Sequence, residues 1–207
     1  MKSASPITCR QRSTPAGGFF TKNWTGYSLT IMEHLNQLSF RDREGNELGA
    51  DEGFQIWCDH TKELKRTRNR IFFIGNGASA SMASHIAADL AKNAHILTEV
   101  FFDLSLMTAL ANDIRFEAIF SEPLSWKMQT NDMLVAISSS GNSPNIVEAV
   151  HAARTKNGRT VTLSAMSGDN TIRSLGDLNL YLPADTYGLA ESCHASVLHY
   201  WVDCMAG

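Results

Sequence analysis

Short, continuously apolar runs alternate along the chain with longer segments whose apolar positions recur every three or four residues. Runs such as IFFI and MLVAI have no polar side, which is typical of parallel strands that are covered on both faces. We therefore predict strands over residues 70–74, 99–104, 133–138, 160–164 and 178–182.

The segments between and before these strands have the spacing of amphipathic helices. The predicted helices span residues 25–38, 54–65, 79–93, 106–112, 116–129, 145–156 and 188–205. The polar stretch RDREGNELGADEG, residues 41–53, contains three glycines and is predicted to be a loop. Residues 1–22 are rich in Ser, Thr, Pro and Gly without periodicity, so we predict a flexible leader there.

This alternation predicts one α/β domain over residues 23–207. The expected architecture is a doubly wound, mainly parallel five-stranded sheet flanked by helices, with an N-terminal helical extension.

Composition narrows the class of protein. The 207 residues are 43% hydrophobic and 19% charged, which is typical of a soluble globular protein. A net charge of −3 gives no general electrostatic reason to bind nucleic acid, and no apolar run reaches the length of a membrane span. The four cysteines are scattered without metal-site spacing, so we expect free thiols and a cytoplasmic location.

A glycine turn follows the first predicted strand. Its hexapeptide, GNGASA at residues 75–80, fits the G-x-G-x-x-A fingerprint of dinucleotide-binding proteins. In that interpretation Glu99 or Asp103, about twenty residues further on, would bind a ribose.

A second turn, ISSSGNSPN at residues 137–145, is rich in serine and leads from a strand into a helix. Hydroxyl groups and free backbone N–H groups at the positive end of a helix dipole bind phosphate without a lysine. The alternative is that Ser143 or Asn145 only caps the helix. Parallel strands place both turns at one edge of the sheet, where ligands bind.

Histidines and acids occur at helical spacing after the glycine turn and in the last helix. His85 and Asp89 are four residues apart and share a helix face. In the last helix Glu191 and His199 lie near one face, whereas His194 points elsewhere.

Four blocks of the sequence resemble a known family. GNGASASMASHIAADL, ALANDIRFEAIF, AISSSGNSPNIVEAVHAAR and ESCHASVLH follow, in order, the blocks of the sugar isomerase (SIS) domain and, within it, the phosphoheptose isomerases. The resemblance covers residues 70–203 and implies the flavodoxin-like fold of SIS proteins.

The resemblance also implies roles for individual residues. It places the sugar against Asn76, Gly77, Ala78, Ser79, Glu191, Asn112 and Asp113. It places the phosphate against Ser138, Ser139, Ser140 and Ser143. Zinc, or another divalent metal, would be held by His85, Asp89, Glu191 and His199, with Asp89 and His199 as the catalytic pair for proton transfer.

The implied activity is aldose–ketose isomerisation of a sugar phosphate, sedoheptulose 7-phosphate to D-glycero-D-manno-heptose 7-phosphate, through an enediol. The family forms homotetramers whose active sites lie between subunits. This chain has Asp89, Glu191, Ala78 and Asn93 where the family has Glu, Gln, Gly and Arg. These differences leave two alternatives open: a non-catalytic sugar-phosphate-binding or regulatory protein, and an isomerase of a different phosphosugar.

Overall fold

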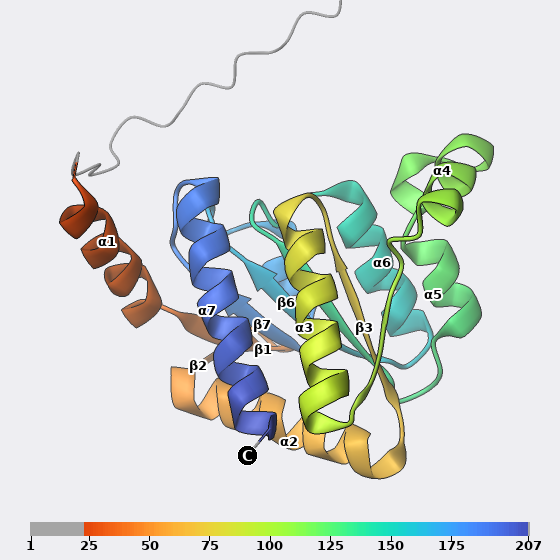
Figure 1. Ribbon diagram of the computed structural model, residues 1–207, viewed down its shortest axis with the longest axis horizontal. Helices are drawn as coiled ribbons and strands as arrows, with labels where there is room; N and C mark the ends of the chain where they lie inside the picture. The colour runs from red at the N-terminus through yellow and green to blue at the C-terminus, as the bar shows by residue number, and fades with distance from the viewer. Residues whose placement is uncertain (1–22, 207) are drawn as a thin grey trace, which may run out of the picture.

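The computed structural model describes residues 23–206, and the predicted leader over residues 1–22 lies outside them. One seven-stranded sheet has helices on both faces (Figure 1). Its strands, in the order β2-β1-β7-β6-β5-β3-β4, are β1 (Ser39–Asp42), β2 (Glu47–Leu48), β3 (Arg70–Gly75), β4 (Leu97–Val100), β5 (Met133–Ser138), β6 (Arg159–Ser164) and β7 (Leu178–Tyr181). The α-helices are α1 (Trp24–Asn36), α2 (Ala50–Thr67), α3 (Ala78–Ala94), α4 (Leu104–Asp113), α5 (Ser121–Lys127), α6 (Pro144–Thr155) and α7 (Tyr187–Ala206).

The five predicted strands correspond to β3–β7, which pair in parallel and confirm the predicted fold class, but the sheet has seven strands rather than the predicted five. The strand order reverses between β3 and β5, which lie side by side with Gly75 opposite Ile137. Such a reversal point is where doubly wound sheets bind ligands. It places the glycine turn and the serine turn next to each other.

Each face of the sheet has its own hydrophobic core. Phe73 on β3 points toward α2, α3 and α7, where Trp57 and Trp201 stack with ring centroids 4.1 Å apart. Phe72, the preceding residue, points to the other core under α4, α5 and α6. A strand that is buried on both faces has apolar residues at successive positions, which explains the apolar run in the sequence. No helix among residues 23–206 is long and apolar enough to cross a membrane.

The prediction of a loop over residues 41–53 was wrong. β1 and β2 form a hairpin there, and β1 extends the sheet antiparallel to β7. Its turn is closed by Asp42, whose Oδ1 accepts from the Asn46 N–H at 2.8 Å, and by Gly45 at φ +89°. The rest of the segment begins α2, where Gly53 has no side chain to collide with the buried ring of Phe40.

Two other predicted boundaries were also wrong. The helix predicted over 116–129 is divided into a short 3₁₀ turn, η1 (Phe116–Ala118), and α5. Pro123 then lies in the first turn of α5 rather than inside a continuous helix. Proline is tolerated there, because an N–H in the first turn has no hydrogen-bond partner within the helix. The strand predicted over 99–104 ends at Val100, since the Asp103 side chain accepts from the Leu106 N–H and starts α4.

The helical extension, α1, packs against α7 but has no buried residue of its own (Figure 1). Three of the four cysteines, Cys58, Cys193 and Cys204, are free thiols, as expected. Cys9 lies outside the described residues.

Candidate functional site

The glycine turn brings the end of β3 close to the start of α3. A Cβ at Gly75 would lie 2.6 Å from the carbonyl carbon of Ser79, so only glycine allows this approach. Gly77 is the N-cap residue at φ +55° and offers no side-chain oxygen to the helix. The first turn of α3 therefore has no side-chain cap, and the N–H groups of Ser79 and Ala80 donate instead to the carbonyl oxygens of Asn76 and Gly77.

The serine turn joins β5 to α6. Ser138 and Ser139 are only 5% exposed, and Ser143 is the N-cap residue of α6. The Ser143 side chain makes no capping hydrogen bond, so its hydroxyl is not used by the helix. The interpretation in which Ser143 or Asn145 only caps the helix therefore does not describe this turn.

The two turns are tied together by a pair of amides. Asn145 Nδ2 donates to Asn76 Oδ1 at 2.8 Å, and Asn76 Nδ2 donates to Asn145 Oδ1 at 3.0 Å. The turns belong to different helices, so this pair fixes the spacing between them.

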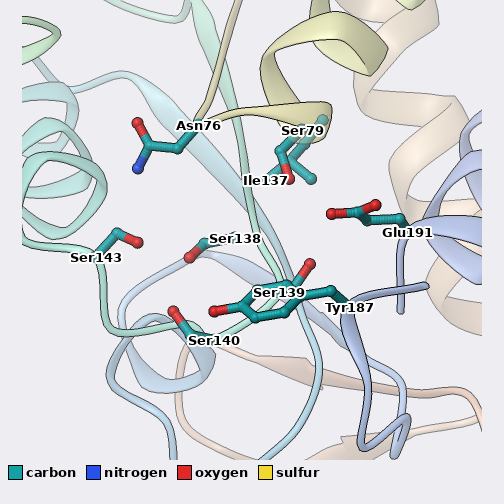
Figure 2. A pocket seen from close by; sticks show the side chains of 9 residues that line it. All are labelled: Asn76, Ser79, Ile137, Ser138, Ser139, Ser140, Ser143, Tyr187 and Glu191. Atoms are coloured by element: carbon teal, nitrogen blue, oxygen red, sulfur yellow. The ribbon is translucent and has the colours of Figure 1, made fainter. Parts of the chain in front are cut away.

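Between the turns and the start of α7 lies a pocket of about 130 Å³. It is lined by Asn76, Ser79, Ile137, Ser138, Ser139, Ser140, Ser143, Tyr187 and Glu191 (Figure 2). None of these nine residues is cationic. An anion in this pocket would be held by hydroxyl groups, amides and helix N-termini, which is the kind of phosphate site that the serine turn predicts.

Tyr187 was missed by the sequence analysis. Its ring and the Glu191 carboxylate point into the pocket from the first two turns of α7, opposite Asn76 and Ser143 (Figure 2). Tyr187 precedes Glu191 by four residues, so both lie on one helix face. The four-residue spacing from Glu191 could have indicated that Tyr187 faces the same site, but a single tyrosine forms no recognisable motif.

His85, Asp89 and His199 form a separate group on the outer faces of α3 and α7. One ligand atom of each lies within 4.8 Å of the others. His85 Nε2 is 3.3 Å from Asp89 Oδ2, and the two imidazole rings are 5.3 Å apart at 65°. Two imidazoles and one carboxylate are suitable ligands for zinc, and three protein ligands would leave a coordination position open.

Glu191, the fourth predicted ligand, is not in this group and lines the pocket instead. Eight residues of α7, a rise of about 12 Å, separate it from His199.

His194 belongs to neither site. It is fully buried on the inner face of α7, and its Nε2 lies 3.3 Å from the Ser164 carbonyl oxygen. Burial lowers the pKa of His194 to about 4, because the charged imidazolium would lose its hydration. This histidine therefore stays neutral near pH 7 and is part of the core.

Four other predicted sugar-binding residues do not line the pocket: Gly77, Ala78, Asn112 and Asp113. Gly77 and Ala78 lie in the glycine turn beside it. Asn112 and Asp113 are exposed at the end of α4, where the Asn112 amide donates to Asp113 Oδ1 at 2.8 Å. Helix α4 lies apart from α3 and α7 (Figure 1).

The acids required by the dinucleotide interpretation have other partners. Asp103 caps α4, and Glu99 forms ion pairs with Arg70 at 3.0 Å and Lys127 at 2.5 Å. In that interpretation the serine turn, which shares the pocket, would also have no role.

Comparisons with known proteins agree with these observations. Residues 52–165 match the family model described as SIS domain. The chain is 36% identical to phosphoheptose isomerase from Pelobacter propionicus over 148 residues, which cover 68% of this chain and 77% of that protein. It is 33% identical to phosphoheptose isomerase from Azoarcus sp. over 186 residues, covering 83% and 94%. The structure of phosphoheptose isomerase GmhA from Neisseria gonorrhoeae is similar with a TM-score of 0.76 at 25% identity, covering 87% of this chain and 94% of that chain.

Proposed function

The chain belongs to the phosphoheptose isomerase family of SIS-domain proteins, and we propose that it interconverts sedoheptulose 7-phosphate and D-glycero-D-manno-heptose 7-phosphate. The reaction is an aldose–ketose isomerisation, carried out by one domain over residues 23–207. The observation that carries the proposal is the pocket at the sheet edge, which offers hydroxyl groups and helix N-termini to a phosphate and has no cationic lining residue.

The phosphate is assigned to the serine turn. Ser138, Ser139, Ser140 and Ser143 surround one side of the pocket, and the uncapped start of α6 lies behind them. This remote group anchors the substrate, so that its binding energy orients the reacting carbons. The sugar is assigned to the glycine turn and to Glu191.

Isomerisation of the ketose removes a proton from C1 while the C2 carbonyl oxygen gains one, which gives the enediol. The enediol then loses the O1 proton and gains a proton at C2. We assign these transfers to Asp89 and His199, whose carboxylate and imidazole are common acid–base groups in enzymes. Asp89 is one methylene shorter than the family's Glu, so its carboxylate must be held close to the carbon that it serves.

We propose zinc, or another divalent cation, on His85, Asp89 and His199. The three donor atoms fit a cation because they lie within 4.8 Å of one another. Such a cation polarises the carbonyl group of the substrate. We assign Glu191 to the sugar rather than to this cation, because about 12 Å of helix separate it from His199. Asp89 has two carboxylate oxygens, so it would be able both to hold the cation and to accept a proton.

We further propose a homotetramer with active sites between subunits. Helix α1 has no buried residue, and Trp24, Leu29 and Met32 on it are exposed. Exposed apolar side chains gathered on one helix favour an interface. In the assembly, Asn112 and Asp113 of α4 are assigned to the pocket of a neighbouring subunit.

The test is to incubate the zinc-loaded protein with sedoheptulose 7-phosphate and to follow the aldose phosphate by NMR, with a chelator-treated sample alongside. We expect conversion that is lost on chelation and restored by zinc. Conversion that continues unchanged after the metal is removed would contradict the metal assignment.

A second function is favoured by one observation. The shorter Asp89 and the extra negative charge of Glu191 are changes at the positions where the family carries out its chemistry. A regulatory or other non-catalytic sugar-phosphate-binding protein would tolerate both residue changes, because it does not need to transfer a proton. Calorimetry that detects tight binding of sedoheptulose 7-phosphate, together with NMR that detects no aldose, would replace the isomerase with this function.

A further inference from the structure

Asn145 is a polar residue whose side chain serves neither its own helix nor the pocket directly. It is the second residue of α6 and is 2% exposed. It does not line the pocket, and its amide is directed to the neighbouring turn. A buried amide without partners would cost free energy, so its hydrogen bonds identify what it does.

Those hydrogen bonds form a closed pair with Asn76. Each amide donates to the oxygen of the other, at 2.8 and 3.0 Å. Turning over either amide alone would set oxygen against oxygen and nitrogen against nitrogen, so the pair fixes both orientations. The Asn76 amide has one further N–H donor and one further oxygen lone pair that its hydrogen bonds with Asn145 do not use. Asn76 also lines the pocket.

We propose that Asn145 is a positioning residue, which acts through Asn76 to set the donor and acceptor that the glycine turn presents to the sugar. The same pair sets the spacing between the turn assigned to the sugar and the turn assigned to the phosphate. The inference rests on the proposed function in taking a sugar phosphate as the ligand. It goes beyond that function by making a residue outside the pocket a determinant of how the sugar is oriented.

A double-mutant cycle tests the inference with Asn145→Ala, Asn76→Ala and the double variant. The measurements are kcat/KM for sedoheptulose 7-phosphate, the Kd of the same sugar by calorimetry, and the Kd of inorganic phosphate. We expect Asn145→Ala to lower kcat/KM about 10- to 100-fold, since small misplacements of a bound substrate have effects of that size. We expect the Kd of inorganic phosphate to change little, because Asn145 does not line the pocket and the four serines assigned to the phosphate are unchanged.

The decisive comparison is made in the Asn76→Ala background. If Asn145 acts through Asn76, its replacement there has no further effect on kcat/KM or on the Kd of the sugar. If the two single effects simply add, Asn145 has only a general structural role and the inference is overturned.

Asn142→Ala provides a matched control from the same turn. Asn142 Oδ1 accepts from the Thr171 N–H at 2.9 Å and from the Thr171 hydroxyl at 2.7 Å, so it ties the turn to a different segment. We expect its effect to add to that of Asn76→Ala. If Asn145→Ala does not fold, Asn145→Asp replaces it in the cycle. That variant still accepts from Asn76 but cannot donate, and its charge suits a helix N-terminus.

The proposed function can fail separately. If the wild-type protein binds sedoheptulose 7-phosphate without converting it, the isomerase assignment is wrong, and the cycle is read from the Kd alone. If it binds neither the sugar phosphate nor inorganic phosphate, the positioning role of Asn145 is overturned as well.

Discussion

The pocket and the His85, Asp89 and His199 group both depend on α3 and α7, but the fold supports them very differently. The pocket lies at the sheet edge, where Ser138 and Ser139 are nearly buried and an amide pair holds the two turns. The group lies on the outer helix surfaces, and the side chain of His85 is 60% exposed. The pocket is therefore preorganised by the core, whereas packing restrains the exposed His85 side chain of the group much less.

The largest expected effect comes from the exposed group. His199→Asn removes a proton-transfer group and one proposed ligand of the cation while leaving the pocket intact, so we expect kcat to fall about 10²- to 10⁴-fold. The Kd of sedoheptulose 7-phosphate, measured by calorimetry, should stay nearly constant. His151→Asn on α6 is the control, because His151 is also exposed but lies outside both sites. Full activity in the His199 variant would show that the group has no part in the chemistry.

A buried histidine on the same helix gives the next largest effect, and it is an effect on stability. The pKa of His194 is about 4 in the folded protein and 6.5 in the unfolded chain, so below pH 6.5 only the unfolded chain readily takes up this proton. The free energy of unfolding should therefore fall as the pH decreases, by about 3 kcal/mol at pH 4 from this residue.

Urea denaturation of the wild-type protein and of His194→Gln at pH 7, 5.5 and 4.5 measures this difference. We expect a shallower pH dependence in His194→Gln than in the wild-type protein. If the free energy of unfolding changed with pH in the same way in both proteins, the protonation of His194 would not affect stability and the prediction would be wrong.

The sequence predicts the pocket better than it predicts the group. Residues on one turn are close in sequence, and the parallel strands bring the ends of β3 and β5 to one edge, so the serines and Asn76 could be placed in advance. Glu191 and His199 share a helix, which suggests a shared ligand. Only the structure shows that Glu191 faces the pocket while His199 meets His85.

Other features could not be predicted because they depend on packing between distant segments. Tyr187 lines the pocket only because the fold brings the start of α7 next to the serine turn. The hairpin of β1 and β2 has a polar sequence, but it is held by pairing with β7 and by the burial of Phe40 under α2. A sequence pattern shows which side of a segment is apolar, but not which neighbour covers it.

Zinc binding should stabilise the protein by a smaller amount. At a free zinc concentration about 100 times the Kd, the free energy of unfolding should rise by about 2.7 kcal/mol. The rise is measured as a shift in Tm, and His85→Ala should remove it while His151→Ala keeps it. An equal shift in all three proteins would place the zinc elsewhere.

The smallest effect should arise in the preorganised pocket, where several donors share the phosphate and the loss of one is partly compensated. Ser140→Leu removes one hydroxyl and fills part of the pocket, so we expect KM for sedoheptulose 7-phosphate to rise about tenfold or more. The kcat should change less than KM, because the three remaining serines still anchor the phosphate and orient the reacting carbons. Ser174→Leu is the matched control, since Ser174 is exposed outside the pocket and its replacement should leave KM unchanged. If Ser140→Leu lowered kcat and left KM unchanged, the serine turn would belong with the reacting carbons rather than with the phosphate.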